Sequence, residues 1–346
     1  MKRLLLLALV LLGLDLALWF AGPRAPASAG PGRRVGLVFD VGGRGDKSFN
    51  DLAWAGLERA RRELGVEVET IEPGDGSDRE SALRLLAARG FDLVIGVGFI
   101  FSDDIAGIAR EYPHAAFACI DYAVPQDAAG RPLAPPDNLA GLKFREEEGS
   151  FLVGAAAALA SRTGRVGFVG GMDIPLIRRF EAGYRAGVRE VCPTCTVAVN
   201  YAGVTGAAFK DPGKGKELAL AQYGTGADVI FHASGSTGLG VFEAARLADG
   251  LAIGVDADQS WEAPGHVLTS MVKRVDVAVF RLAQEVVEGS FRGGVRSFGL
   301  AEDGVGWVVD DTTRAHLPAG SESQIGALKD RIVAGEVAVP DRPEAL

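Results

Sequence analysis

Aspartate residues follow three of the apolar runs in this 346-residue chain. Asp40, Asp121 and Asp256 each come directly after four or more apolar or small residues, the pattern of a strand end. One such carboxylate is ordinary, because aspartate is common in turns and at helix starts. In doubly wound sheets, however, ligands bind beyond the carboxyl ends of the strands. Three carboxylates at such places predict a cleft that accepts hydrogen bonds from a neutral polar ligand.

The segment after Asp40 is rich in glycine and reads GGRGDKSFN over residues 42–50. It resembles a phosphate-binding loop only superficially, because such a loop has glycine directly before the lysine and Asp46 stands there. We interpret the segment as a turn that delivers Phe49 and Asn50 at a helix start. An aromatic ring there can stack on a ligand ring, and an amide can donate and accept hydrogen bonds. Composition alone equally allows Phe49 to be a hydrophobic staple.

Catalytic patterns are not found in the sequence. None of the four histidines has a catalytic setting, and neither a serine nucleophile elbow nor ligand spacing for a metal occurs. Gly235–Gly238 opens a helix after a strand, but it is too short for a dinucleotide fingerprint. We therefore predict that the protein is not an enzyme and has no cofactor and no metal site.

The elements that position these residues alternate between short apolar strands and amphipathic helices. The strands are continuous apolar runs, as expected for strands buried on both faces. The first half predicts strands at 35–39, 66–71, 93–97 and 115–120, and helices near 49–64, 78–88 and 105–112. After a helix at 147–160, strands follow at 166–169, 196–200, 229–231 and 253–255, with helices near 176–191, 212–223 and 238–248. Such repeats imply parallel sheets with right-handed crossovers, here two successive α/β units.

The N-terminus has the layout of a secretory signal peptide, which we place at residues 1–29. Lys2 and Arg3 precede an apolar run from Leu4 to Phe20, and small residues follow. The alternative is a retained membrane anchor, although Asp15 makes a stable span costly. No cysteine lies near the cleavage region, so lipid attachment to a cysteine is not expected there. We predict an exported protein, in the periplasm or at the outer face of the cytoplasmic membrane.

The net charge bears on the partners of the protein, and the compartment bears on the state of its cysteines. The net charge of −9 argues against binding nucleic acid. Cys119 lies in an apolar run and is predicted to be a buried core thiol. Cys192 and Cys195 could form a redox pair, half a zinc site or a structural disulfide. Export favours the disulfide.

A family resemblance emerges from several motifs in order. The chain resembles the basic membrane protein family of substrate-binding proteins, of the purine nucleoside receptor type, from about residue 34 to residue 307. The motifs that carry the resemblance are Asp40 with DKSFN at 46–50, Gly98-Phe99, Tyr112-Pro113, Ile120-Asp121, GVDADQ at 254–259 and TSMVK at 269–273.

The resemblance implies a type I periplasmic-binding fold, with two doubly wound lobes joined by a three-stranded hinge. Residues 34–142 and about 275–310 would form the first lobe. Residues 143–272 and the C-terminal segment would form the second. Such a protein binds a purine nucleoside between its lobes and delivers it, as a monomer, to an ABC permease and ATPase complex. Many relatives are lipoproteins, and the missing lipid-bearing cysteine leaves the tethering of this chain open.

Seven positions match the ligand contacts of the family: Asp40, Phe49, Asn50, Asp121, Phe209, Asp256 and Lys273. The resemblance implies that Phe49 stacks on the base and that Phe209 is its partner ring from the second lobe. Asn50 and Asp121 would hydrogen-bond the base or orient it.

At the other end of the ligand, the resemblance implies that Asp256 and Lys273 hold the ribose hydroxyls and that Asp40 contributes from the first lobe. A cleft of aromatic rings and carboxylates also suits a sugar or a flavin. A signalling receptor of the same fold and a nucleoside hydrolase are the alternatives from other functional classes.

Overall fold

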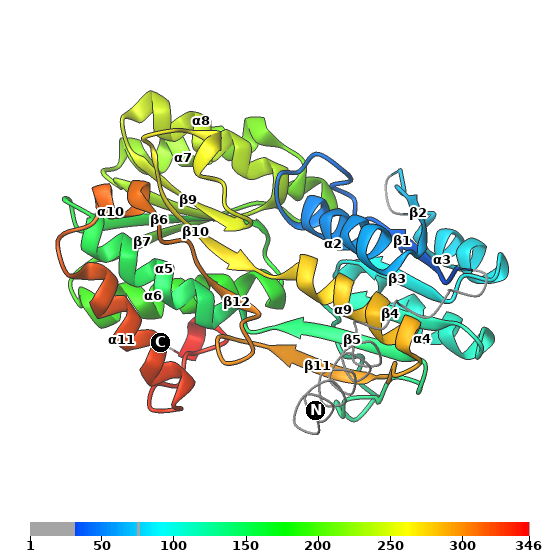
Figure 1. Cartoon of the computed structure of the whole chain (residues 1–346). Coiled ribbons are helices and arrows are strands. Elements are labelled where there is room, and N and C mark those ends of the chain that lie inside the picture. Colours follow the sequence, from blue (N-terminus) through cyan, green and yellow to red (C-terminus); the bar gives the residue numbers. More distant parts are fainter. Residues whose placement is uncertain (1–31, 75–76, 346) are drawn as a thin grey trace, which may run out of the picture. The chain divides into compact units, whose positions relative to one another are not determined.

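A computed structural model describes residues 32–74 and 77–345, which include two six-stranded sheets with helices on both faces (Figure 1). The signal peptide predicted at residues 1–29 lies outside the described residues. Each sheet with its helices is called a lobe below. The predicted fold class, with two α/β lobes built on parallel sheets, is confirmed.

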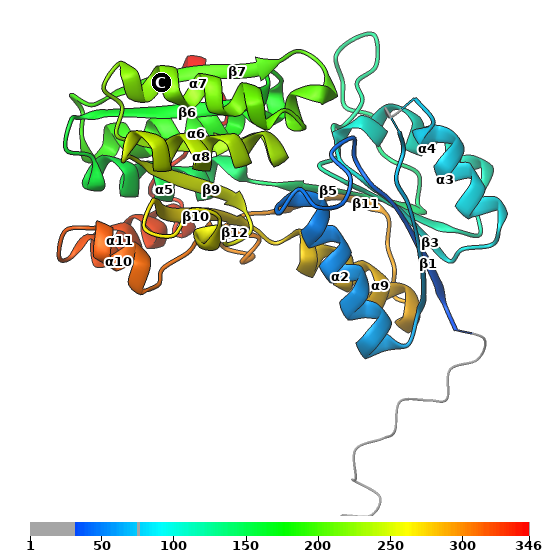
Figure 2. The same cartoon turned by 90° about the horizontal axis from the view of Figure 1, so that it is seen from above.

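The first lobe is built on a fully parallel sheet in the order β11-β5-β4-β3-β1-β2. Its strands are β1 (Arg34–Val38), β2 (Glu67–Ile71), β3 (Leu93–Val97), β4 (Ala116–Ile120), β5 (Leu139–Phe144) and β11 (Gly294–Phe298). Its helices are α2 (Phe49–Leu64), α3 (Arg79–Ala88), η1 (Phe99–Phe101), α4 (Ser102–Glu111) and α9 (Val275–Glu288). Figure 2 shows α2 and α9 on one face of this sheet and α3 and α4 on the other.

Alternating residues of the strands fill two apolar layers. In β3, Leu93, Ile95 and Val97 belong to the core under α2 and α9, whereas Val94 belongs to the core under α3 and α4. Successive side chains of a strand point to opposite faces, so a strand covered on both sides must be apolar throughout. The unbroken apolar runs of the sequence arise from this arrangement.

The second lobe repeats the same winding in the order β12-β10-β9-β8-β6-β7. Its strands are β6 (Arg165–Met172), β7 (Thr196–Gly203), β8 (Val229–Ala233), β9 (Leu251–Asp256), β10 (Val267–Lys273) and β12 (Val305–Trp307), of which only β12 is antiparallel. Its helices are α5 (Glu146–Ala160), α6 (Pro175–Val191), η2 (Gly206–Phe209), α7 (Pro212–Gly224), η3 (Gly235–Thr237), α8 (Gly238–Ala248), η4 (Ser260–Glu262), α10 (Asp311–His316), α11 (Ser321–Val333) and η5 (Pro343–Ala345).

Glycines bring α5 and α6 into close contact. A Cβ on Gly183 would lie 2.0 Å from the backbone oxygen of Glu147, and one on Gly187 would lie 1.9 Å from that of Phe151. Only glycine permits such an approach of two backbones. This packing sets the positions of the acidic start of α5 and of Phe180 on α6.

The chain passes between the two sheets three times in the described residues, at Phe144–Glu146, Lys273–Val275 and Phe298–Val305. These passages correspond to the expected three-stranded hinge. One boundary differs from the expectation, because β12 pairs with β10 in the second sheet. The return to the first lobe therefore ends before Val305, earlier than the expected residue 310.

The cysteines follow the favoured interpretation. Cys192 and Cys195 are joined by a disulfide between the end of α6 and the start of β7. Cys119 is a buried free thiol, and burial raises its pKa. In the described part of the chain, we find no helix with the length and apolar character that a membrane crossing requires.

Candidate ligand-binding site

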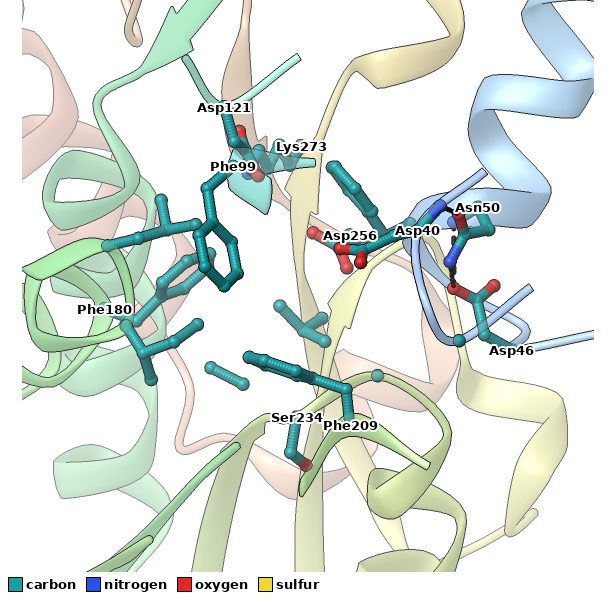
Figure 3. A pocket seen from close by; sticks show the side chains of 17 residues that line it. Asp40, Asp46, Asn50, Phe99, Asp121, Phe180, Phe209, Ser234, Asp256 and Lys273 are labelled. Carbon is teal, nitrogen blue, oxygen red and sulfur yellow. Dashed lines mark hydrogen bonds and ion pairs between the residues drawn. The ribbon is translucent and has the colours of Figure 1, made fainter. Parts of the chain in front are cut away.

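A cavity lies where the carboxyl ends of both sheets meet (Figure 3). It contains about 580 Å³ of empty space, a figure that includes open solvent at its mouth. Asp121, Phe209, Asp256 and Lys273 line it from the ends of other strands or the turns after them. The loops after β1 and β3 in the first sheet and after β6 and β8 in the second form the rest of its walls. In both sheets these two strands are neighbours at which the strand order reverses, the usual ligand position in doubly wound folds.

The loop after β1 is held by Asp46, which caps α2. Its Oδ2 accepts hydrogen bonds from Asn50 N (2.8 Å) and Asn50 Nδ2 (3.0 Å), and its Oδ1 accepts one from Ser48 N (3.0 Å). These bonds satisfy amides at the helix start that have no intrahelical partner. Asn50 Oδ1 in turn accepts a bond from Asp40 N at 3.1 Å. These bonds hold Asp40 in place beside the cavity. They also position Phe49, which directly precedes Asn50 and lines the same cavity.

Asp40 carries a carboxylate with little polar support. Burial raises the pKa of Asp40 to about 7, although its Oδ1 accepts a bond from Val41 N at 2.7 Å. Gly98 packs directly against this carboxylate. A Cβ on Gly98 would lie 2.4 Å from Asp40 Oδ2. Gly98 also has a φ of 113°, a conformation that side chains rarely adopt. Glycine is thus required there to leave room for Asp40.

Lys273, at the end of β10, brings a buried cation to the cavity. Its Nζ lies 2.6 Å from Asp121 Oδ1 and 3.1 Å from Glu146 Oε1, and it donates a 2.7 Å hydrogen bond to Asp121 Oδ2. The rings of Phe49 and Phe180 lie 5.1 and 5.6 Å from the same nitrogen. Burial alone would lower the pKa of Lys273, but the neighbouring carboxylates raise it above its usual value. The lysine therefore stays charged.

Asp256, the last residue of β9, is bonded to the other lobe. Ser48 Oγ donates a 2.5 Å hydrogen bond to Asp256 Oδ2, and burial raises the pKa of this carboxyl to about 7. Gln259 Nε2 also reaches the first lobe and donates to the carbonyl oxygen of Lys47 at 3.0 Å. These contacts join the loop after β1 directly to the segment after β9. We call this arrangement, in which the two lobes touch across the cavity, the closed form.

Strained backbone is concentrated around the cavity. Five non-glycine residues of the described chain have positive φ, and three of them are Lys47 (57°), Asp121 (59°) and Asp256 (66°). This left-handed conformation costs free energy for residues with a Cβ, and aspartate tolerates it better than most. Strain of this kind is typical of functional sites, where it aims a side chain.

An aromatic wall completes the cavity from the second lobe. Phe209 ends η2 and packs so closely on β6 that a Cβ on Gly171 would lie 2.2 Å from its ring. Ser236 Oγ donates to the carbonyl oxygen of Phe209 at 3.1 Å and holds the turn. Phe180 lies on the face of α6 that is turned to the cavity, and Phe99 enters it from the first lobe (Figure 3).

The structure brings all seven predicted positions to this one cavity: Asp40, Phe49, Asn50, Asp121, Phe209, Asp256 and Lys273. Their roles as ligand contacts stay predictions. Both polar ends of the Asn50 amide are engaged within its own loop, so this residue serves at least to position Asp40 and Asp46.

Sequence reasoning missed several residues of the cavity. Phe180 lies within an amphipathic helix, where an aromatic ring reads as part of the core, and Glu146 was not recognised as a partner of Lys273. Ser234 follows β8 directly and could have been found by the strand-end rule that found the aspartates. Phe99 was quoted in a motif but was assigned no role.

The histidines and acids do not form a metal site within the described residues. His232 is fully buried, is bonded to Gln259 at 3.1 Å and does not line the cavity. Burial lowers the pKa of His232 to about 4, so its ring is neutral at physiological pH.

Comparisons with known proteins place the chain in a family. Residues 34–342 match the Bmp family, described as PnrA-like ABC transporter substrate-binding proteins. The CD4+ T-cell-stimulating antigen of Listeria monocytogenes is 34% identical (89% of this chain, 88% of the relative), and the ABC transporter nucleoside-binding protein BmpA of Lactococcus lactis is 30% identical (89% of each). An uncharacterised lipoprotein of Pyrococcus abyssi is 36% identical (86% of this chain, 74% of the relative).

Solved structures agree with this result. A solute-binding protein of an ABC transporter system from Aeropyrum pernix superposes with a TM-score of 0.78 at 34% identity (89% of this chain, 94% of the other). A lac repressor shares only the fold, with a TM-score of 0.56 at 14% identity (86% of this chain, 98% of the other). The resemblance inferred from the motifs is thereby confirmed, and the chain belongs to the Bmp family of ABC transporter substrate-binding proteins.

Proposed function

We propose that this protein binds a purine nucleoside in the cavity between its lobes. The observation that carries the proposal is the pairing, in one cavity, of aromatic rings from both lobes with buried carboxylates (Figure 3). A flat neutral ring with a hydroxylated sugar matches both parts. The Lactococcus relative, whose name describes it as nucleoside-binding, supports the same ligand class.

The base is held by stacking. Phe49 comes from the first lobe and Phe209 from the second, so a ring between them contacts both lobes at once. Stacking of a base on an aromatic side chain contributes about 1–3 kcal/mol and tolerates different bases. Asp121 and Asn50 then orient the base. A ligand that contacts both lobes stabilises the closed form over an open one.

The ribose is held by Asp256 and Lys273. A carboxylate accepts hydrogen bonds from hydroxyl groups, and the lysine ammonium donates them. A ligand without these hydroxyls leaves buried polar groups unpaired and is therefore rejected. Lys273 is the cation in the lining of this cavity, and it is already paired with Asp121 and Glu146, so a nucleotide phosphate gains little there.

Transport follows from the family and the closed form. We propose that the protein acts outside the cytoplasm and delivers its ligand to an ABC permease and ATPase complex. Its part in this process is binding without chemical change of the ligand. A signalling role for the closed form is separated from transport by measuring uptake of the ligand in cells with and without the gene.

The test is calorimetry of the purified chain with inosine, adenosine, guanosine, free ribose, AMP, a sugar and a flavin. We expect binding of purine nucleosides, a weak response to ribose and none to AMP. Asp256→Ala should weaken nucleoside binding roughly 10-fold to 100-fold, as for the loss of a hydrogen bond to a charged group. The control is Asp258→Ala, two residues away, because Asp258 is exposed and does not line the cavity. Binding of a sugar or flavin in place of nucleosides, or turnover of inosine, contradicts the proposal.

A further inference from the structure

A second cavity adjoins the ligand cavity on the side of the Phe144–Glu146 passage between the lobes. It contains about 570 Å³ of empty space, open solvent included. We call it the hinge-side chamber. Its lining comes from the loop after β4, the end of β5 and the start of α6, and includes Tyr122, Ala123, Phe144, Ile174 and Pro175.

The two cavities share a wall. Phe99, Asp121 and Leu176 line both of them. Asp121 is tied to Lys273, and the rest of the shared wall is Phe99 from the first lobe and Leu176 from the second. Figure 3 shows the Phe99 ring directed into the ligand cavity.

The position of Phe99 is set by its neighbours. Gly98 precedes it with a φ of 113°, and Gly98 N donates to the carbonyl oxygen of Ile120 at 3.1 Å. Phe99 then opens the short turn η1, whose last residue Phe101 is fully buried. The turn is therefore anchored on both sides of Phe99, which sets where the ring enters the wall between the two cavities.

The chamber has the chemistry of an apolar subsite. Aromatic and aliphatic side chains from both lobes make up most of its lining. Arg179 also lines it, but its Nη1 is already bonded to Glu146 Oε2 (3.2 Å) and to the carbonyl oxygen of Phe144 (3.3 Å). Lys143 is the other cation, and the acids Asp121 and Glu146 lie in the same lining. Apolar contact is thus the main interaction that the chamber offers.

We propose that Phe99 is a specificity-determining residue that excludes base-substituted ligands from the hinge-side chamber. With Phe99 in place, the ligand cavity accepts an unsubstituted purine nucleoside. Without it, the two cavities join, and the chamber takes a bulky apolar substituent carried by the base. The inference rests on the proposed function, and it names the substituent class that the site rejects.

The test compares Phe99→Ala with the parent chain by calorimetry. The probes are adenosine and adenosines that carry a benzyl-sized group at N6, C2 or C8. We expect the parent to bind adenosine and to reject the substituted forms. Phe99→Ala should bind at least one substituted form more tightly than the parent does, by about 10-fold to 100-fold, the gain from burying an apolar group of that size.

Two further variants separate a partition from a general loss of packing. Phe209→Ala removes a ring that lines the ligand cavity only, so it should weaken adenosine binding without admitting any substituted form. Phe99→Tyr keeps the partition and should reject the substituted forms as the parent does. The inference is wrong if Phe209→Ala shows the same increase in affinity for the substituted adenosines as Phe99→Ala. It is also wrong if Phe99→Ala binds AMP and none of the substituted adenosines.

A crystal structure of ligand-free Phe99→Ala provides a second measurement that does not depend on nucleoside binding. One continuous cavity is expected, and collapse of Leu176 into the gap contradicts the inference. If the parent binds no nucleoside but the cavities join, the proposed function fails while the partition stands.

Discussion

The carboxyl groups that line the ligand cavity are supported in two different ways. Asp121 forms a direct ion pair with Lys273, which also contacts Glu146. Among the described residues, neither Asp40 nor Asp256 makes an ion pair, and burial raises the pKa of each to about 7. Burial also raises the pKa of Asp121, but the attraction of Lys273 opposes this shift. Asp121 is therefore held by an ion pair, whereas Asp40 and Asp256 are not.

This difference separates support from recognition. A buried acid that is paired with a cation has little to gain from a ligand, and its main effect is on the geometry of the site. A buried acid with few partners is costly by itself and gains from any donor that arrives. The contrast predicts that changes to the Lys273 ion pair affect folding first, whereas changes to Asp40 and Asp256 affect pH dependence and binding first.

The largest effect is expected for Lys273→Met. The variant leaves Asp121 buried without its cation and leaves Glu146 with Arg179 alone, which should lower the free energy of unfolding by about 3–5 kcal/mol. Urea unfolding of the ligand-free chain measures the loss. Adding Asp121→Asn should restore part of it.

Lys216→Met is the matched control, because Lys216 forms an exposed ion pair with Glu243. Such a pair contributes about 0–1 kcal/mol. If both lysine variants lower the free energy of unfolding equally, the buried Lys273 pair supports the fold no more than an exposed pair does.

A smaller effect, spread over pH, is expected for Asp40→Asn. The folded chain keeps the Asp40 proton up to about pH 7, whereas the unfolded chain releases it near 3.8. The stability that this proton provides is present below pH 4 and is lost as the pH rises towards 7, by at most about 1.4 kcal/mol per pH unit. Asp40→Asn should reduce this slope. Asp256 and Glu147, whose pKa values burial also raises to about 7, contribute to the remaining slope with the same sign.

Asp173→Asn controls for the loss of a carboxyl group. The hydrogen bond from Arg178 lowers the pKa of Asp173, so this group does not titrate between pH 4 and 7 in the folded state. Between pH 4 and 7, the stability of Asp173→Asn should therefore change with pH as steeply as that of the parent chain. A slope that Asp40→Asn leaves unchanged means that Asp40 is ionised in the folded chain.

The smallest effect is expected for Ser48→Ala. The hydroxyl donates to Asp256 across the lobes, and the backbone amide of residue 48 keeps its bond to Asp46. Loss of one hydrogen bond to a carboxyl group should speed ligand dissociation about tenfold, as measured by stopped-flow fluorescence. Ser290→Ala, which loses a surface bond to the Glu285 carbonyl, should not change the rate. Unchanged dissociation in both variants means that the cross-lobe bond does not stabilise the closed form.

Most of the fold could be predicted because its strands are buried on both faces. Apolar runs such as 93–97 leave no choice of face, and the structure has β3 at those residues. Four strands were not predicted, namely β5, β10, β11 and β12. β5 and β10 are buried, but Lys143 in β5 and Thr269 and Ser270 in β10 interrupt their apolar runs. β11 lies at the sheet edge and is only partly buried, and β12 has three residues, too few for a pattern.

The site residues also divide into those that strand positions predict and those that they do not. Asp121 and Asp256 could be found because they follow strands, and topology alone brings strand ends together. Phe209 could be found only through the family resemblance, because a four-residue turn leaves no periodic signal. The pairing of Glu146 with Lys273 depends on how α5 meets β10, which only tertiary packing determines.

The left-handed backbone at Asp121 and Asp256 restricts how this receptor can be re-engineered. Threonine, valine and isoleucine are poorly tolerated at such angles, so the practical replacements at both positions are asparagine and glycine. A designer who wants a new cargo gains more freedom from positions on regular secondary structure, such as Leu176 and Phe180 on α6. The two acids therefore act as a fixed frame, and changes of cargo are expected to arise around them.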